Sequence, residues 1–190
     1  MTKHELRTLY LEKRKALTET EVKSASECIF SRFREAFPVT AGQKFHIFIS
    51  ISKFNEVHTA PFIKELWEKG ARVFVPKMLD GEIISVEIFP DTEMIQNSWG
   101  IREPESNKDA RVKDFNYIIT PLLYCDRSGG RVGYGKGFYD RFFATLEPNC
   151  SKVGVGFFAP GLPVADLTKE DVPLDYLVTP DEILSFSIGC

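Results

Sequence analysis

The chain has 190 residues and a formal net charge of −3, from 27 acidic and 24 basic side chains. A domain of this length can bury roughly 70% of the surface of its unfolded chain, so we expect residues 1–190 to form a single domain with a substantial core. The slightly acidic balance argues against nucleic-acid binding, which needs a strong basic field, and no apolar run approaches the length of a membrane span.

The N-terminus is predicted to form a charged helix rather than a signal peptide. Apolar residues recur at helical spacing over residues 4–17. Lys3, Arg7 and Arg14 fall near one face of this helix. Such a face is usually only solvated, but if the helix packs beside an anion-binding loop, its cations can bind phosphate or a carboxylate.

A second helix is predicted after a capping box, and the chain then alternates between strands and helices. Thr18-x-x-Glu21 opens the second helix, and Pro38 ends it. A third helix is expected between Thr59, as its N-cap, and Gly70. Strands are expected at residues 45–51, 72–75, 83–89, 115–123, 152–157 and 176–179, and a fourth helix at 138–146.

This order of elements predicts an α/β fold, in which a mainly parallel sheet is flanked by helices on both faces and preceded by an N-terminal helical pair. In such sheets, ligands bind beyond the carboxyl ends of the strands. Three segments lie at such ends: the residues after Ile51, the residues after Phe157, and a glycine-rich segment that follows the predicted strand at 115–123.

The glycine-rich segment at 129–141 carries five glycines in nine residues. A backbone without Cβ atoms can take positive φ and approach a bulky anion closely. Arg131, Lys136 and Asp140 lie in the same segment, a mixture that suits a polyphosphate and its metal ion. The spacing matches neither a P-loop nor a dinucleotide fingerprint, and an ordinary flexible loop is the alternative.

Glu56 follows the predicted strand at 45–51. Its carboxylate could accept hydrogen bonds from the N–H groups of a heterocycle, or it could be a solvated loop acid. Ile49 and Phe54 could form apolar walls nearby, although core packing is the more common use of such residues. Trp99 could stack on a flat ligand or anchor its own loop.

Asp166, Asp171 and Asp175 form an acidic stretch near the end of the chain. One of them could join Asp140 around Mg²⁺, which is typically held by a few carboxylates together with substrate phosphates. The four cysteines and three histidines show no metal-ligand spacing, so no transition metal is expected. Scattered, reduced thiols favour a cytoplasmic protein.

Taken together, these segments resemble the 5-formyltetrahydrofolate cyclo-ligase family over nearly the whole chain. Arg131-Val-Gly-Tyr-Gly-Lys-Gly-Phe-Tyr-Asp140 is the most specific of them, although Lys136 and Phe138 stand where many members have Gly and Tyr. The other matching segments are Lys3-x-x-x-Arg7 with Arg14, Asn55-Glu56-Val57-x-Thr59, Trp99-Gly-Ile-x-Glu-Pro104, Asp171-x-x-x-Asp175 and Val178-Thr179.

The resemblance implies an ATP-dependent closure of 5-formyltetrahydrofolate to 5,10-methenyltetrahydrofolate, with ATP as co-substrate and Mg²⁺ as cofactor. Lys136 and Arg131 would act on the transferring phosphoryl group, and Asp140 and Asp171 would bind Mg²⁺. The residues implied for ATP are Lys3, His4, Glu5, Leu6, Arg7, Arg131, Val132, Gly133, Tyr134, Gly135, Lys136, Gly137, Phe138 and Tyr139. The residues implied for the folate are Arg7, Ile49, Glu56, Tyr134, Gly135, Lys136, Gly137 and Phe138.

Two other functions remain open on the sequence. The first is a different ATP-using kinase or ligase on the same scaffold, which would keep the loop and the metal but change the acceptor. The second is a non-catalytic module that binds a nucleotide or a folate. The candidate metal carboxylates favour catalysis, since retention of a nucleotide needs no poised metal. A monomer whose partners are ATP and a small folate is expected.

Overall fold

The computed structural model describes residues 1–98 and 100–186, so the predicted role of Trp99 lies outside the described residues. The helices are α1 Lys3–Lys15, α2 Glu19–Ala36, the short 3-10 helix η1 Ser52–Phe54, α3 Ala60–Glu68 and α4 Phe138–Phe143. The strands are β1 Lys44–Ile47, β2 Arg72–Leu79, β3 Glu82–Ile88, β4 Met94–Gln96, β5 Arg102–Pro104, β6 Tyr117–Pro121, β7 Tyr124–Cys125, β8 Arg131–Val132, β9 Ser151–Val155, β10 Tyr176–Val178 and β11 Ile183–Ser185.

A seven-stranded sheet forms the centre of the fold, in the order β11-β10-β9-β6-β1-β2-β3. The five strands from β10 to β2 run parallel to one another. The two edge strands, β3 and β11, are antiparallel to their neighbours. The predicted α/β class with a mainly parallel sheet is confirmed, and the antiparallel edges are an addition that the sequence did not indicate.

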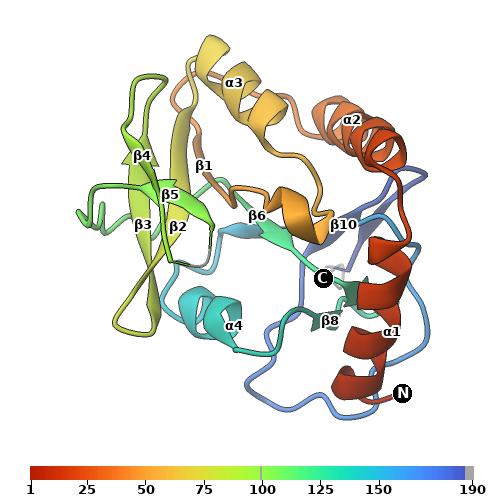
Figure 1. The fold of residues 1–190 in the computed structure, drawn as a ribbon. Helices are drawn as coiled ribbons and strands as arrows, with labels where there is room; N and C mark the ends of the chain where they lie inside the picture. Colours follow the sequence, from red (N-terminus) through yellow and green to blue (C-terminus); the bar gives the residue numbers. More distant parts are fainter. Residues whose placement is uncertain (99, 187–190) are drawn as a thin grey trace.

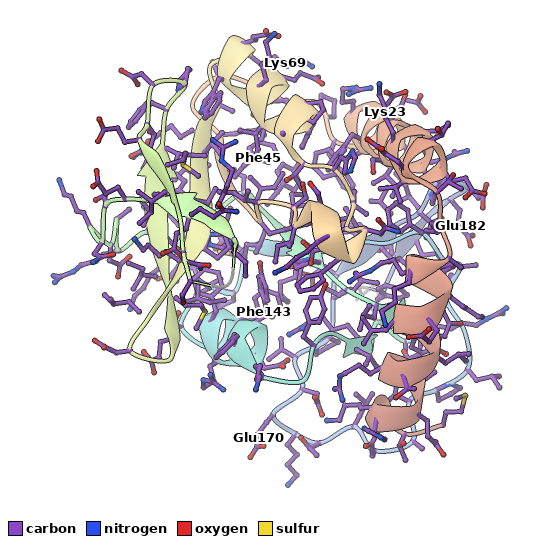
Figure 2. The ribbon with its side chains drawn as sticks, in the orientation of Figure 1. Lys23, Phe45, Lys69, Phe143, Glu170 and Glu182 are labelled. Atoms are coloured by element: carbon purple, nitrogen blue, oxygen red, sulfur yellow. The ribbon has the colours of Figure 1, made fainter. Side chains whose placement is uncertain are left out.

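Helices cover both faces of this sheet (Figure 1). Successive side chains of a strand point to opposite faces, so each strand supplies two cores. On one face, Phe45 packs in a large cluster with residues of α2 and α3. On the other face, Phe74 and Ile118 pack against Phe143 of α4. Figure 2 shows Phe45 and Phe143 on either side of the sheet.

Capping boxes fix the starts of the two N-terminal helices. Thr2 and Glu5 form one at α1, and Thr18 and Glu21 form the predicted one at α2. In each box the threonine hydroxyl accepts from the backbone of the glutamate, and the carboxylate accepts from the threonine backbone. Because the first box was not anticipated, α1 begins one residue earlier than predicted, and it ends two residues earlier, at Lys15.

Most predicted strands differ in length from the observed ones: β6, β9 and β10 are shorter than predicted, and the contacts of β1 and β2 explain their ends. β1 ends at Ile47 rather than Ile51, because side chains replace the ladder there: Ser50 N–H donates to the Thr59 hydroxyl at 3.2 Å, and Ile51 N–H donates to Glu56 Oε2 at 2.8 Å. β2 runs through Pro76 to Leu79. Its pairing with β1 stops at Phe74, so one edge of the strand is free of ladder hydrogen bonds where proline stands.

Helix α1 packs beside the glycine-rich segment. Leu6 forms a small buried cluster with Tyr124 of β7, Val132 of β8 and Val164. β8 leads directly into the glycines, so this cluster places α1 next to them (Figure 1). The helix therefore packs beside the loop, which is the arrangement that the proposed role of its cations requires.

Candidate active site

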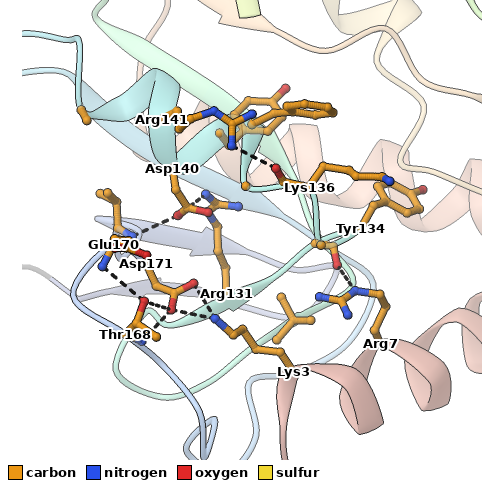
Figure 3. A pocket seen from close by; sticks show the side chains of 18 of the residues that line it. Lys3, Arg7, Arg131, Tyr134, Lys136, Asp140, Arg141, Thr168, Glu170 and Asp171 are labelled. Atoms are coloured by element: carbon orange, nitrogen blue, oxygen red, sulfur yellow. Dashed lines mark hydrogen bonds and ion pairs between the residues drawn. The ribbon is translucent and has the colours of Figure 1, made fainter. Parts of the chain in front are cut away.

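A cavity of about 810 Å³ lies where α1, the glycine-rich segment and residues 168–172 meet (Figure 3). Pro121, the last residue of β6, also lines it. The cavity therefore lies at the carboxyl end of a central parallel strand, where ligands of α/β sheets bind. Its lining from the glycine-rich segment runs without a gap from Arg131 to Arg141.

The glycines let the segment close around an arginine of α1. Gly135 has a φ of +87°, and a Cβ at this position would lie 2.8 Å from the Arg7 guanidinium. Arg7 Nε donates to the Gly133 carbonyl at 2.8 Å. Gly137, also left-handed, begins the six-residue helix α4. The turn thus holds a cation against exposed backbone, an arrangement that can receive an anion.

Two ion pairs line the cavity (Figure 3). Lys3 Nζ contacts both carboxylate oxygens of Asp171, at 2.8 and 3.0 Å. Arg131 Nη2 contacts Asp140 Oδ1 at 2.8 Å, and the same oxygen accepts from the backbone of Val172. Both pairs are partly buried. Burial alone would raise the pKa of Asp171, but hydrogen bonds from Lys3 and Thr168 lower it, so this carboxylate is ionised at neutral pH.

The structure separates the three aspartates that the sequence left as alternatives. Asp171 lines the cavity. Asp166 instead accepts from the backbone N–H of Lys3 at 2.6 Å, at the start of α1. Asp175 accepts from Lys152 N–H at 2.7 Å near the amino end of β9. Asp171 is therefore the one of the three that shares the cavity with Asp140.

A Mg²⁺ ion beside Asp140 and Asp171 would need further oxygen atoms from a bound phosphate or from water. Within residues 1–98 and 100–186, no three His, Cys, Asp or Glu side chains are grouped to hold a metal ion. Mg²⁺ commonly takes one or two carboxylates and completes its shell with substrate phosphates and water. Asp140 and Asp171 would supply the protein's share, and Mg²⁺ would neutralise phosphate charge there.

Lys136 lies in the exposed part of the glycine-rich segment and is one of the residues that line the cavity. Its ammonium makes no hydrogen bond or ion pair with the residues that the structure describes. Its carbonyl accepts from Arg141 Nη1 at 3.1 Å, and Arg141 also reaches the Gly81 carbonyl. The backbone around Lys136 is therefore held, while its charge is available to a ligand.

Glu56 is buried rather than solvated, with 3% of its surface exposed. Oε2 accepts from Ile51 N–H at 2.8 Å, and Oε1 accepts from the Tyr134 hydroxyl at 2.8 Å. Tyr134 lines the cavity, so its hydroxyl links Glu56 to the glycine-rich segment. Burial raises the pKa of Glu56, against the opposing effects of these two hydrogen bonds and of the Arg14 charge. The alternative of a solvated loop acid is wrong.

Replacing Glu56 with glutamine is expected to flatten the pH dependence of stability. Because the folded-state pKa lies above the ordinary value of 4.5, the stability that Glu56 contributes is full below that value and is lost as pH rises through the folded-state pKa. Glu56→Gln removes this loss. Urea unfolding midpoints measured from pH 4.5 upward should favour the variant increasingly; parallel profiles would contradict the assignment.

The structure places most of the other residues predicted for ligand binding in the cavity lining and the rest outside it. Lys3 and Arg7 line the cavity, as do Arg131, Val132, Gly133, Tyr134, Gly135, Lys136, Gly137, Phe138 and Tyr139. His4 and Glu5 are exposed on α1, Leu6 is in the buried cluster, and Ile49 packs partly buried against the large core. These four, like Glu56, are not among the lining residues, and the roles of all five in binding stay predictions.

Asp126, whose carboxylate fixes the turn at the start of the glycine-rich segment, was not identified from the sequence. This carboxylate is fully buried. Oδ1 accepts from the backbones of Ser128 and Gly130 at 2.9 Å each, and Oδ2 accepts from Val164 N–H. A Cβ at Gly130 would lie 2.7 Å from Oδ2. The sequence Asp126-Arg-Ser-Gly-Gly130 is typical of a side-chain-capped turn, and that signal could have identified it.

Comparisons with known proteins agree over nearly the whole chain. The model of the 5-formyltetrahydrofolate cyclo-ligase family matches residues 1–180. The 5-formyltetrahydrofolate cyclo-ligase of Escherichia coli K12 is 28% identical over 178 residues, covering 90% of this chain and 97% of that protein. Its counterpart in Haemophilus influenzae is 34% identical over 132 residues, covering 65% of this chain and 70% of that protein.

A solved structure gives the same result. The NMR structure of Aquifex aeolicus 5,10-methenyltetrahydrofolate synthetase superposes with a TM-score of 0.83 at 28% identity, covering 100% of this chain and 95% of that one. Within the described part of this chain, no helix is both long and apolar enough to span a bilayer. From the family match, the relatives and the shared fold, we conclude that this chain belongs to the 5-formyltetrahydrofolate cyclo-ligase family.

Proposed function

We propose that this protein catalyses the ATP- and Mg²⁺-dependent cyclisation of 5-formyltetrahydrofolate to 5,10-methenyltetrahydrofolate, releasing ADP and phosphate. One observation carries the proposal: a single cavity brings together a glycine-rich turn, the cations Lys3, Arg7, Arg131 and Lys136, and the carboxylates Asp140 and Asp171. Cations and backbone N–H groups are what a triphosphate needs, and the two carboxylates suit its metal ion.

The reaction requires activation of the formyl group. A formamide oxygen is a poor leaving group, so attack by N10 on the formyl carbon stalls at the addition stage. Transfer of the γ-phosphoryl group of ATP to that oxygen gives an imidate-like phosphate. N10 then attacks the same carbon, which closes the five-membered ring, and N10 loses its proton to solvent. The carbon–oxygen bond breaks, and phosphate leaves with the former formyl oxygen.

The protein's part in this step is positioning and charge neutralisation, since phosphoryl transfer needs little covalent help. Arg131 and Lys136 would contact the transferring phosphoryl group from two sides of the glycine-rich segment. Lys3 and Arg7 would hold the remaining phosphates from α1. Bound Mg²⁺ would supply further neutralisation of the phosphate charge beside Asp140 and Asp171.

The folate would lie toward the Tyr134 side of the cavity. Glu56, reached through Tyr134, would accept hydrogen bonds from the N–H groups of the pterin, and Phe138 would offer an apolar surface. Ile49 would contact the substrate from behind Glu56. His4, Glu5 and Leu6 would contribute to ATP binding through the first turns of α1, chiefly by placing Lys3 and Arg7.

We further propose that residues 1–190 act as a monomeric, single-domain enzyme in the cytoplasm. Cys28 is an exposed free thiol, Cys125 and Cys150 are buried ones, and burial raises the pKa of Cys125 to about 12. Unreactive buried thiols of this kind are compatible with a reducing compartment.

The test is a direct assay for the methenyl product, which has its own near-ultraviolet absorbance. Purified protein is mixed with 5-formyltetrahydrofolate, ATP and Mg²⁺, and ADP is measured in parallel. Product that requires all three components is the expected result. ADP formation without the methenyl signal would instead favour another ATP-using enzyme, and ligand binding without turnover would favour a non-catalytic module.

A further inference from the structure

Arg14 is a buried arginine next to the cavity that nothing in the proposed chemistry uses. It lies in the last turn of α1 and has 4% of its surface exposed. Its Nη2 donates to the Tyr134 hydroxyl, and its Nε is buried without a hydrogen-bond partner among the described residues. Unlike Lys3 and Arg7 on the same helix, Arg14 is not part of the cavity lining.

Stability alone does not account for an arginine at this place. Burying a guanidinium is costly, and leaving one of its N–H groups unpaired adds to the cost. Replacing buried charged groups by apolar side chains of similar volume is often neutral or stabilising. A methionine would fill the same space along the side-chain stem. The charge of Arg14 is therefore better explained by what it does to its neighbours.

Those neighbours belong to three separate segments that meet at one hydroxyl group. The Tyr134 hydroxyl accepts from Arg14 of α1 and donates to Glu56 Oε1 at 2.8 Å. The side chain of Asn55, the residue before Glu56, bonds the backbone at the end of α1. Its Nδ2 donates to the Arg14 and Leu17 carbonyls at 3.1 and 2.9 Å. These hydrogen bonds thus fix the positions of the end of α1, the glycine-rich segment and the Glu56 loop relative to one another.

The arrangement also affects the pKa of Glu56. Burial favours its neutral form, and the positive charge of Arg14 opposes this. The hydroxyls of Tyr134 and Tyr139 lie near this carboxylate and are neutral at physiological pH, and burial raises the pKa of each further above its ordinary value. As a carboxylate, Glu56 has about four acceptor positions, of which Ile51 and Tyr134 use two. Glu56 is not itself among the residues that line the cavity, so a ligand's N–H donors would reach the remaining positions from beside Tyr134, which does line it.

We propose that Arg14 is a positioning residue for folate recognition: through the Tyr134 hydroxyl it keeps the glycine-rich segment registered on Glu56, and by its charge it keeps Glu56 a hydrogen-bond acceptor. This inference rests on the proposed function. It assigns Arg14 to folate recognition from outside the cavity lining, whereas Lys3 and Arg7 on the same face of α1 would hold phosphates and Arg7 would also contact the folate.

The test compares Arg14→Met with Arg14→Lys and with a control, Arg34→Met. Arg34 pairs with Glu65 at 2.8 Å between α2 and α3, on the opposite side of the sheet from α4. Arg14→Met should raise the KM for 5-formyltetrahydrofolate about tenfold or more, the order of one charge-assisted hydrogen bond. The KM for ATP should change less than about twofold, and Arg14→Lys should recover part of the loss. Arg34→Met should leave both KM values unchanged.

Thermal unfolding and a second variant separate a loss of folate recognition from a loss of folding. The midpoint of Arg14→Met should be no lower than that of Arg34→Met. Tyr134→Phe, which removes the shared hydroxyl and keeps the ring, should show the same selective effect on the folate if Arg14→Met does not fold. An unchanged folate KM in the folded variants, or equal increases in both KM values, would overturn the proposal. Wild-type protein that makes no methenyl product would instead reject the proposed function itself.

Discussion

Lys136→Ala is expected to lower kcat for methenyl formation by a factor on the order of 10² to 10³. Its ammonium lines the cavity and has no partner among the described residues, so its charge is available to the transferring phosphoryl group. Losing one preorganised electrostatic contact of this type typically costs about 3 kcal/mol in the barrier. Because Lys136 is exposed and contributes nothing to the core, the free energy of unfolding should stay within about 0.5 kcal/mol of wild type.

The matched control is Lys23→Ala, which removes the same charge from an exposed position on α2 (Figure 2). It should retain full turnover, which would separate a local effect from a change in net charge. Steady-state kinetics at saturating ATP and folate, with urea unfolding of each variant, make the comparison. A kcat for Lys136→Ala equal to that of Lys23→Ala would remove Lys136 from the catalytic step.

Asp140→Asn and Asp171→Asn are each expected to raise the magnesium concentration needed for half-maximal activity. This concentration should rise by at least ~10- to 100-fold, which is the loss of metal affinity that removing an outer-shell partner of a metal causes. Asparagine keeps the shape and one acceptor oxygen of aspartate but removes its charge. Excess Mg²⁺ should therefore restore part of the activity of each variant, and magnesium titrations of ADP formation provide the measurement.

Asp175→Asn is the control for this pair, because Asp175 belongs to the same acidic stretch but bonds Lys152 near the amino end of β9. Its magnesium curve should match that of wild type. Thermal unfolding should accompany each titration, since Asp140 also pairs with the buried Arg131. A wild-type curve for Asp140→Asn or Asp171→Asn would remove that residue as a metal ligand.

The sequence predicted the type and order of most elements because hydrophobic periodicity and caps are local signals. The Thr18–Glu21 box and the six expected strands were each found near their predicted positions. The ends were less accurate where a distant partner decides them. β1 stops early because Thr59 and Glu56 take its backbone donors, and β2 passes through Pro76 because its neighbour has already ended.

For the site, the glycine-rich segment could be recognised because its composition alone carries a physical meaning. The choice among Asp166, Asp171 and Asp175 could not be made, since it depends on which end of a strand each side chain faces. Burial of Glu56 and Arg14 could not be predicted either, because both hydrogen-bond a tyrosine that is far away in the sequence. Such contacts follow from the packing of α1, which no local pattern specifies.

The most direct test of the account follows the formyl oxygen itself. 5-Formyltetrahydrofolate labelled with oxygen-18 in its formyl group is converted in a single turnover with excess enzyme, ATP and Mg²⁺, and the inorganic phosphate is examined by mass spectrometry. If the γ-phosphoryl group is transferred to that oxygen, the label should appear in the released phosphate, one atom for each product formed. Methenyl product accompanied by unlabelled phosphate would contradict the account.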